Sequence, residues 1–448
     1  MSRDVKKPDP TTFCVYPWVE QVVQSSGKVG FCCVAKGGGV IKKDGGGVYR
    51  AGQDKLSDAW NSQHMRDIRK GMVNGEHVPG CELCYFQESI GKKSYREMHN
   101  DEWMRKARKE VNERVEKSQL EDFKVEKEAF YLDLRLGNLC NLRCRSCNSY
   151  NSSQIYRETI QLLDTNAEYK TFYSRHNGDK PPPATAEWFE SDQFWDEVIA
   201  SIPNLRKVYL TGGEPTLIEK NYKFMQACID SGHAKNIFLM FNINCTNVQD
   251  KFLSYLPHFQ FVLVNASIDG VGGSNEYIRD RSRWETVDGN FRKLVQLPRN
   301  VQIGVTPVIQ VYNILSITEL LDYVESVSNS SGRDINVDFL YATDPPYINP
   351  QILPAAIKAD AVARLEAYKK KSRTYQSQPY LKNSIDSCIN LLNEHPEADM
   401  AKLRDFADYT RMLDVSRKQS IHATFPELAQ RLEAEGLSFK AEPEVSNG

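Results

Sequence analysis

The middle of the chain, from residue 130 to about 345, alternates short apolar runs rich in β-branched residues with longer helical stretches. This alternation is typical of repeated βα units and a parallel sheet. It predicts six strands, at 130–136, 207–211, 236–244, 261–269, 301–309 and 336–342. Most of these runs are separated by roughly 30 residues, the length of one strand and its crossover helix. The prediction is therefore an α/β fold built on a parallel sheet.

The flanking regions have different patterns. Residues 11–95 are rich in Gly and Cys and show little periodicity, which favours a small domain stapled by metal over one with an apolar core. Residues 96–128 alternate charge signs and predict a solvated connecting helix. After residue 345 the pattern is amphipathic and helical, followed by a polar tail that we expect to be disordered. The predicted domains are 11–95, 96–128, 129–345 and 346–448.

Composition narrows the class of protein. The chain has 448 residues, 26% of them charged, and a formal net charge of -2, so no global field favours nucleic acid or an anionic membrane. Its first residues, MSRDVKKPDPTTF, lack the apolar run of a signal peptide, and no stretch approaches the roughly 20 apolar residues of a membrane span. These features predict a cytoplasmic protein, with no membrane or nucleic-acid partner expected.

The 11 cysteines are clustered along the chain. In a reducing compartment, clustered thiols are available as soft metal ligands and are seldom structural disulfides. We expect the isolated cysteines to be small core residues or bystanders. The clusters are Cys14, Cys32, Cys33, Cys81 and Cys84 in the first 90 residues, and Cys140, Cys144 and Cys147 within eight; the isolated ones are Cys228, Cys245 and Cys388.

The second cluster lies in LRLGNLCNLRCRSCNSYNSSQI, between the first predicted strand and a helix. Loops at the carboxyl ends of strands are where βα folds build their active sites. Three thiolates at C-x-x-x-C-x-x-C can bind three irons of a four-iron cluster and leave the fourth iron open. The alternatives are three incidental thiols or a zinc site, and structural zinc usually takes C-x-x-C pairs from two knuckles.

The string CNLRCRSC after a strand resembles the cluster loop of the radical S-adenosylmethionine superfamily. The resemblance implies a partial (β/α)6 TIM-like barrel and a catalytic 4Fe-4S cluster held by Cys140, Cys144 and Cys147. It implies that S-adenosylmethionine chelates the unique iron. One electron, from a reductant such as flavodoxin or ferredoxin, would then cleave the cofactor to a 5'-deoxyadenosyl radical. This radical abstracts hydrogen from substrate. In one departure from the family, Ser146 stands where many members have an aromatic residue.

A second motif, YLTGGEPTL, follows the second predicted strand. Gly212 and Gly213 permit close backbone approach, and Glu214 offers an acceptor for an ammonium group. Taken alone, GGE is a common turn. One βα unit after the cysteine loop, it resembles the family's motif for the amino group of the methionyl moiety.

Polar residues also follow the third and fourth predicted strands, and for each of them turn capping is an equal alternative to a ligand role. These residues are Asn244, Thr246, Asn247, Ser267 and Asp269. The family resemblance implies that Ser267 and Asp269 contact the ribose or the carboxylate of the cofactor. It also implies that Arg279, in EYIRDRSRW, binds the cofactor carboxylate, with a surface salt bridge as the alternative.

The N-terminal cysteines form a pattern of their own. Cys14 and Cys32 flank Gly27 as C-x(12)-G-x(4)-C, and Cys81 and Cys84 form a later C-x-x-C. Four thiolates from two segments can close around a metal, and spacing alone leaves zinc and iron-sulfur equal. The pattern resembles the auxiliary-cluster modules called SPASM and, in shortened form, twitch, which implies a second, auxiliary 4Fe-4S cluster. Such modules usually follow the radical core, whereas this one precedes it.

The segment contains further residues that could bind the metal. Cys33 can replace Cys32, and a histidine can supply a ligand, although solvated or capping roles are more common for His64, His77 and His99. Two functions follow for the whole chain. The first is a radical enzyme acting on a peptide or protein, or on a carbohydrate or other small molecule. The second is a non-catalytic iron-sulfur or zinc protein that carries electrons or binds a partner.

Overall fold

The structure is a computed structural model that describes residues 5–35, 39–89, 91–126, 128–178, 180–182 and 187–440. The polar tail expected at the C-terminus lies, from residue 441 onward, outside the described residues. The chain forms two compact units. Unit 1 comprises Met1–Leu139, Ala184–Phe241 and Ser254–Val262; unit 2 comprises Cys140–Pro183, Asn242–Leu253 and Leu263–Gly448.

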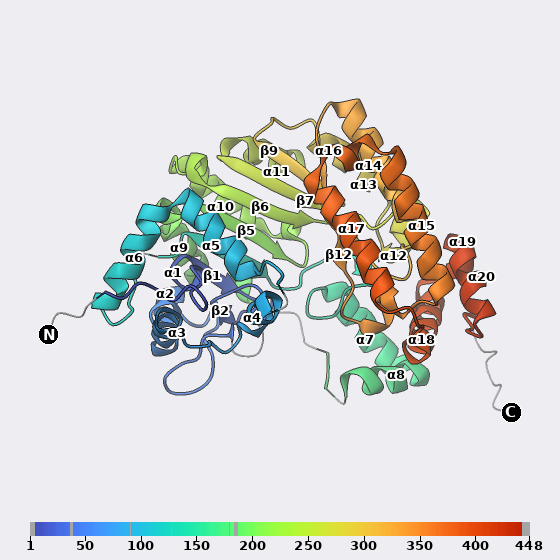
Figure 1. Ribbon diagram of the computed structural model, residues 1–448, viewed down its shortest axis with the longest axis horizontal. Helices are drawn as coiled ribbons and strands as arrows, with labels where there is room; N and C mark the ends of the chain where they lie inside the picture. Colours follow the sequence, from blue (N-terminus) through green and yellow to red (C-terminus); the bar gives the residue numbers. More distant parts are fainter. Residues whose placement is uncertain are drawn as a thin grey trace. The chain divides into compact units, whose positions relative to one another are not determined.

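The main sheet has the strand order β11-β9-β7-β6-β5-β3-β1-β2, and several of its strands are seen side by side in Figure 1. All its registered pairs are parallel except β1 with β2. The strands are β1 (Glu20–Val23), β2 (Val29–Gly30), β3 (Tyr131–Leu136), β5 (Lys207–Gly212), β6 (Phe238–Ile243), β7 (Phe261–Ala266), β9 (Val301–Val305) and β11 (Asn336–Val337). Each of the six predicted strands contains a strand of the main sheet, and the fold is α/β with a mostly parallel sheet. The predictions 301–309 and 336–342 are confirmed only in part, because each is divided into two short strands and the second of each pair lies in a separate sheet.

The cysteine-rich segment also has an apolar core, contrary to the expectation of a domain held by metal alone. Its strand β1 pairs in parallel with β3, from Glu20 opposite Tyr131 to Val23 opposite Leu134. Trp18 is fully buried, and its indole Nε1 donates to Ser118 Oγ at 2.9 Å. The run FCVYPWV has no charged or amide side chain to mark a polar face, so neither helical nor strand periodicity revealed it.

Two helices, Tyr95–Lys106 and Arg108–Leu120, occupy most of the segment expected to form one helix, and that expectation is wrong. A capping box of Ser94 and Glu97 begins the first of them. The first helix buries the apolar side chain of Trp103, and the second buries those of Val111 and Val115. The dense charges of the exposed faces concealed these buried positions in the sequence. The helices of unit 1 are α1 (Tyr16–Val19), α2 (Leu56–Trp60), α3 (Gln63–Asn74), α4 (Glu82–Ser89), α5 (Tyr95–Lys106), α6 (Arg108–Leu120), α9 (Asp192–Ala200) and α10 (Glu219–Asp230).

In unit 2, the described chain beyond residue 346 is mostly helical. Helix α18 lies beside α7 and α8 (Figure 1), where Arg411 pairs with Glu168 and Arg417 pairs with Glu158. The helices are α7 (Ser153–Thr165), α8 (Ala167–Asn177), α12 (Gly273–Ile278), α13 (Trp284–Leu294), α14 (Ile317–Ser331), α15 (Ala355–Lys371), α16 (Arg373–Ser377), α17 (Pro379–Glu394), α18 (Met400–Arg417), α19 (Ile421–Thr424) and α20 (Pro426–Ala434). Helix α11 (Asp250–Tyr255) has residues in both units.

Short elements complete the fold. Strand β4 (Arg143–Cys144) pairs antiparallel with β8 (Arg279–Asp280), and β10 (Val308–Ile309) pairs in parallel with β12 (Leu340–Tyr341). Single 3-10 turns occur at Trp188–Glu190, Ile202–Asn204, Pro215–Leu217, Ala234–Asn236, Leu256–His258, Pro346–Ile348 and Pro350–Ile352. The isolated cysteines Cys228, Cys245 and Cys388 are buried, as expected.

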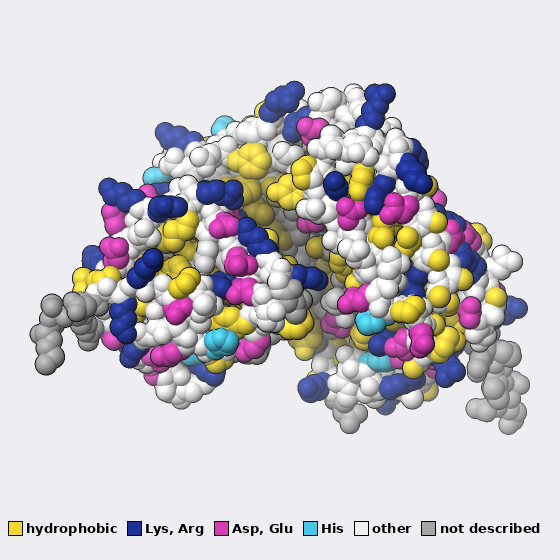
Figure 2. Space-filling model, viewed as in Figure 1, with side chains coloured by type: hydrophobic (Ala, Val, Ile, Leu, Met, Phe, Trp, Pro, Cys, Tyr) yellow, Lys and Arg dark blue, Asp and Glu magenta, His cyan; other side chains and the backbone are white. Residues whose placement is uncertain are grey.

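The surface carries interspersed acidic and basic side chains over the face seen in Figure 2, in keeping with the net charge of -2. Among the described residues, none of the helices combines the length and apolarity that a membrane crossing requires.

Candidate metal centres

The three-cysteine loop follows β3 and is fixed at both ends by hydrogen bonds. Cys144 lies in β4, opposite Arg279 of β8. At the other end, Ser152 caps helix α7 by accepting from Ile155 N, and its hydroxyl donates to Leu142 O at 2.7 Å. The turn that carries Cys140 is thereby tied to the start of α7, and the loop is an ordered part of unit 2.

The spacing of its sulfur atoms distinguishes two kinds of metal site. Within the described residues, the sulfurs of Cys140, Cys144 and Cys147 do not all lie within 4.8 Å of one another. Thiolates around a single tetrahedral zinc lie roughly 4 Å apart, because each is about 2.3 Å from the ion. Thiolates that bind different irons of a cluster lie farther apart. The donor set, three thiols on one loop, can bind three irons of a four-iron cluster.

Arg279 places a buried positive charge beside this loop. Its Nη1 donates to Cys144 Sγ at 3.8 Å, and its Nε lies 2.9 Å from Asp269 Oδ2. The other oxygen of Asp269 accepts from Val308 N at 2.7 Å, so the carboxylate is fixed by the backbone. The resemblance assigned Asp269 and Arg279 to cofactor contacts, and the structure joins them as a buried ion pair.

Burial controls the protonation of the loop thiols. It raises the pKa of Cys144, against the lowering effect of the Arg279 charge. Burial, with the neighbouring Cys144, raises the pKa of Cys147 to about 12. Metal binding would displace these protons, and the nearby guanidinium would stabilise the resulting thiolates.

The GGE motif supports the residue just before the first cysteine of the loop. Gly212 has φ +122°, and a Cβ at Gly213 would lie 2.1 Å from Leu139 O. The next residue, Glu214, donates from its backbone N to Leu139 O at 2.8 Å. The carboxylate of Glu214 is buried and caps the turn Pro215–Leu217 by accepting from Thr216 N and Oγ1. The glycines thus permit a backbone contact that no other residue would allow.

At the end of β6, a closed ring of hydrogen bonds includes a loop residue that the sequence analysis missed. Asn141 Nδ2 donates to Thr246 Oγ1 at 2.7 Å, and Asn244 Nδ2 donates to Asn141 Oδ1 at 2.9 Å. Thr246 Oγ1 completes the ring by donating to Asn244 Oδ1 at 2.6 Å. Asn247 and Ser267 lie outside this ring: the side chain of Asn247 accepts from Gln249, and the backbone of Ser267 donates to Ile243 O.

The sequence analysis also missed Arg143 and Arg145, which flank Cys144. Arg143 pairs with Asp280 at 2.6 Å, and Arg145 pairs with Asp414 at 2.5 Å. The available signal was the alternation of charge and sulfur in LRCRSC. A charged residue between two closely spaced metal ligands is buried together with them and needs a partner.

An open cavity of about 910 Å³, solvent at its mouth included, adjoins the third cysteine of the loop in unit 2. Cys147 forms part of its wall. Six of the other residues that line it are aromatic: Tyr150, Tyr169, Phe172, Tyr173, Tyr347 and Tyr409.

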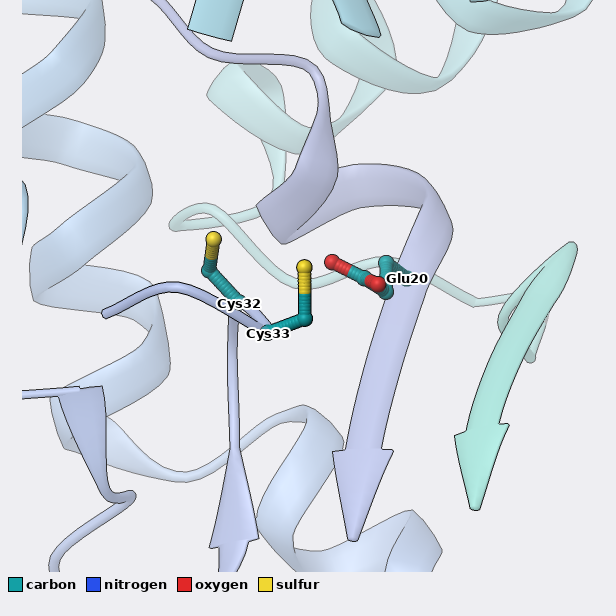
Figure 3. A group of neighbouring side chains, drawn as sticks. All are labelled: Glu20, Cys32 and Cys33. Atoms are coloured by element: carbon teal, nitrogen blue, oxygen red, sulfur yellow. The ribbon is translucent and has the colours of Figure 1, made fainter. Parts of the chain in front are cut away.

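The N-terminal cysteines surround a separate cavity in unit 1. Cys14, Cys32, Cys81 and Cys84 all line it, whereas Cys33 does not. In Figure 3 the sulfur of Cys33 lies beside the carboxyl group of Glu20, and the sulfur of Cys32 lies farther from it. Four thiols from two distant segments thus meet in one place, so this cavity can supply every ligand of a metal centre.

The thiol of Cys33 has a different environment. Its sulfur, the sulfur of Cys32 and a carboxyl oxygen of Glu20 lie within 4.8 Å of one another, and Arg135 donates to Cys33 O at 3.0 Å. Glu20 is fully buried, and burial raises its pKa well above the usual range. Because Cys32 lines the four-cysteine cavity and Cys33 does not, this arrangement favours Cys32 over Cys33 as the ligand.

Of the three histidines considered, one lines the four-cysteine cavity. His99 stacks on Tyr16 with ring centroids 4.0 Å apart, and its Nε2 is buried without a hydrogen-bond partner. His77 instead stacks on Tyr85, and His64 Nδ1 accepts from Lys42 N at 3.2 Å. His99 is therefore the histidine placed to add to the four thiols.

Comparison with known families agrees with the four-cysteine cavity. Residues 14–85 match the family model SPASM, described as an iron-sulfur cluster-binding domain. The matched range contains all four cavity cysteines. Residues 14–85 are therefore similar to an iron-sulfur cluster-binding domain. A search of curated proteins found no match.

Solved structures with similarity to the chain are distant. The structure of anSMEcpe with bound AdoMet has 15% identity and a TM-score of 0.36, and the match covers 63% of this chain and 65% of that one. SuiB of Streptococcus suis bound to S-adenosylmethionine has 12% identity and a TM-score of 0.36, covering 72% and 67%. TYW1 with a lysine-pyruvate adduct has 12% identity and a TM-score of 0.28, covering 55% and 72%. The chain thus spans 65% of the length of anSMEcpe.

Proposed function

We propose that the protein is a radical S-adenosylmethionine enzyme with a partial (β/α)6 barrel and an N-terminal auxiliary cluster. One observation carries the proposal. The three-cysteine loop begins at the carboxyl end of β3, and the GGE motif begins at the carboxyl end of the neighbouring strand β5, where Leu136 pairs with Gly212. Motifs 70 residues apart in the sequence therefore start side by side, at the strand ends where βα folds bind ligands.

In this proposal Cys140, Cys144 and Cys147 hold the catalytic 4Fe-4S cluster. When bound and reduced, that cluster supplies the electron that cleaves S-adenosylmethionine to a 5'-deoxyadenosyl radical, which takes hydrogen from the substrate. The residues of the chain bind the cluster and hold the loop that carries it in position. Gly213 positions Leu139 and so the start of the loop, and Arg279 stabilises the thiolate of Cys144.

The remaining contacts to the cofactor are assigned by resemblance. The GGE motif, Gly212, Gly213 and Glu214, would contact the methionyl amino group of the cofactor. Asn244 and Ser267 would contact other polar groups of the cofactor. Asp269 is fully buried and paired with Arg279, so we assign it to holding Arg279 in place. By the same resemblance, Arg279 would bind the cofactor carboxylate.

The auxiliary 4Fe-4S cluster would be held by Cys14, Cys32, Cys81 and Cys84, whose four thiols fit full ligation. Full ligation by protein suits electron relay or the positioning of substrate, because no iron is left open. We propose a peptide or protein as substrate. The second candidate is a carbohydrate or another small molecule. The electron donor would be a flavodoxin or ferredoxin, and the location the cytoplasm.

The test is anaerobic reconstitution with iron and sulfide, followed by reduction in the presence of S-adenosylmethionine. We expect about eight irons per chain, from two four-iron clusters, and release of 5'-deoxyadenosine. Cys144→Ala should abolish the nucleoside and retain about four irons, whereas the matched control Cys228→Ala, which replaces an isolated buried cysteine, should change neither. About one zinc per chain with no nucleoside would contradict the proposal and favour a non-catalytic metal protein.

A further inference from the structure

The three-cysteine loop has a buried cation between its second and third cysteines. Arg145 has no exposed side-chain surface. Its guanidinium carbon lies 3.7 Å from the centroid of the Tyr277 ring and 5.3 Å from that of Tyr312. Its Nε donates to Tyr277 O at 3.1 Å. A cation between two aromatic rings is favourable only if its charge is also balanced.

The balancing charge comes from the C-terminal helix α18. Arg145 Nη2 lies 2.5 Å from Asp414 Oδ1. The carboxylate of Asp414 also accepts from Tyr277 OH and from Ile421 N, each at 2.8 Å. Tyr409, one turn earlier on α18, donates from its hydroxyl to the Arg145 carbonyl at 3.0 Å. The side chain and the backbone of Arg145 are therefore both bound by α18.

A second set of ion pairs links the same helix to the residue before Cys144. Arg417 of α18 makes two hydrogen bonds to the Glu158 carboxylate, at 2.9 and 2.6 Å. Glu158 Oε1 also lies 2.9 Å from Arg143 Nη1, and Arg143 pairs with Asp280 at 2.6 Å. The side chains of Arg417 and Glu158 are at most 5% exposed, so solvent screens this network little.

These two networks act on the two neighbours of one cysteine. Arg143 and Arg145 flank Cys144, and each is connected to α18 through buried charges. If the charge of Asp414 is lost, Arg145 is left buried without a counter-ion, a state that proteins avoid by moving the cation to solvent. Such a movement displaces the loop segment between Cys144 and Cys147.

We propose that Asp414 is a positioning residue for the three-cysteine loop, and that helix α18 holds this loop in the conformation that binds metal. This inference rests on the proposed function only in taking the loop as the place where a cluster binds. The C-terminal helices are then a structural part of the metal centre.

The first test uses the full-length, metal-free, reduced chain. The rate of alkylation of each cysteine by iodoacetamide is measured by mass spectrometry. We expect Asp414→Asn to increase the rates at Cys144 and Cys147 at least tenfold and to leave those at Cys81 and Cys84 unchanged. The matched control is Asp408→Asn, on the same helix, where the replaced carboxylate is 38% exposed and pairs with Arg411. This readout requires neither a cluster nor turnover, so it remains valid if the proposed function fails.

The second test uses the reconstituted chain. We expect Asp414→Asn to lose at least half of the loop cluster and to retain the auxiliary cluster, as measured by iron content and electron paramagnetic resonance. Tyr409→Phe removes only the hydrogen bond to the Arg145 carbonyl, and it replaces Asp414→Asn in both tests if that variant fails to fold. We expect Tyr409→Phe to show the same changes to a smaller degree. If the tested variant has the same alkylation rates and cluster content as Asp408→Asn, the proposal is overturned.

Discussion

Gly213 contacts Leu139 so closely that a Cβ at this position would lie 2.1 Å from the Leu139 carbonyl oxygen. Leu139 precedes the first loop cysteine, Cys140, so the contact fixes the start of the metal-binding loop. In the same place Glu214 N donates to Leu139 O at 2.8 Å. Because the obstructing atom belongs to the backbone, no side chain can move to make room.

Gly213→Ala should therefore displace the loop. We expect a loss of about 1–3 kcal/mol in the free energy of unfolding, the usual cost of overpacking, and a reduced iron content on reconstitution. The measurements are urea unfolding of the metal-free chain and iron analysis. The matched control is Gly289→Ala in helix α13, where nothing lies within 4 Å of the added methyl group. Equal effects of the two substitutions would contradict the account.

Arg279 should raise the reduction potential of the loop cluster. Its guanidinium lies 3.8 Å from Cys144 Sγ and is almost fully buried, so its charge favours the added electron. We expect Arg279→Met to shift the midpoint potential to lower values and to weaken S-adenosylmethionine binding. A redox titration followed by electron paramagnetic resonance measures the first effect. Arg283→Met, at an exposed position, is the control; an unchanged potential in Arg279→Met would refute the prediction.

Cys32 and Cys33 should differ in function although they are adjacent in sequence. Cys32 lines the cavity with Cys14, Cys81 and Cys84, whereas Cys33 faces Glu20. We expect Cys32→Ala to lose about four irons per chain, the content of one cluster, and Cys33→Ala to retain them. Iron and sulfide analysis after anaerobic reconstitution decides between them. The opposite result would assign Cys33 as the ligand.

Glu102 should make unfolding sensitive to acid. Burial alone would raise its pKa, but hydrogen bonding by His99 and the charges of Lys207 and Lys106 outweigh burial and hold the pKa well below its usual value of 4.5. A depressed pKa stabilises the folded state above the unfolded-state pKa, and this stabilisation is lost as the pH falls below about 4.5.

Glu102→Gln should therefore lower the free energy of unfolding at pH 7 by on the order of 1–2 kcal/mol and by less at pH 4. Urea unfolding of the metal-free chain at the two pH values measures the difference. The control is Glu113→Gln on helix α6, whose carboxylate is 63% exposed. A loss of stability in Glu102→Gln that is equal at both pH values would show that the effect is one of packing.

The sequence determined the sheet and the chemistry of its loops. The strands β3, β5, β6, β7, β9 and β11 were found because each is a short apolar run between turns, a local pattern that burial on both faces imposes. The spacing of Cys140, Cys144 and Cys147 is also local, since three ligands on one loop need no tertiary contact to be recognised. Apolar patterning failed for Trp18 and Trp103. Trp18 lies in an apolar run without a period, and Trp103 is an isolated buried aromatic residue on a highly charged helix.

Only the tertiary structure decided which side chains meet. Arg145 and Asp414 are separated by 269 residues, and no pattern along the chain connects them. Cys32 and Cys33 are adjacent in sequence, and only the fold distinguishes them, because Cys32 lines the four-cysteine cavity whereas Cys33 does not. Strands and ligand spacings depend on residues that are close together in the sequence, so the sequence alone specifies them. The partner of each side chain depends on the packing of elements that are far apart in the sequence, so only the folded chain decides it.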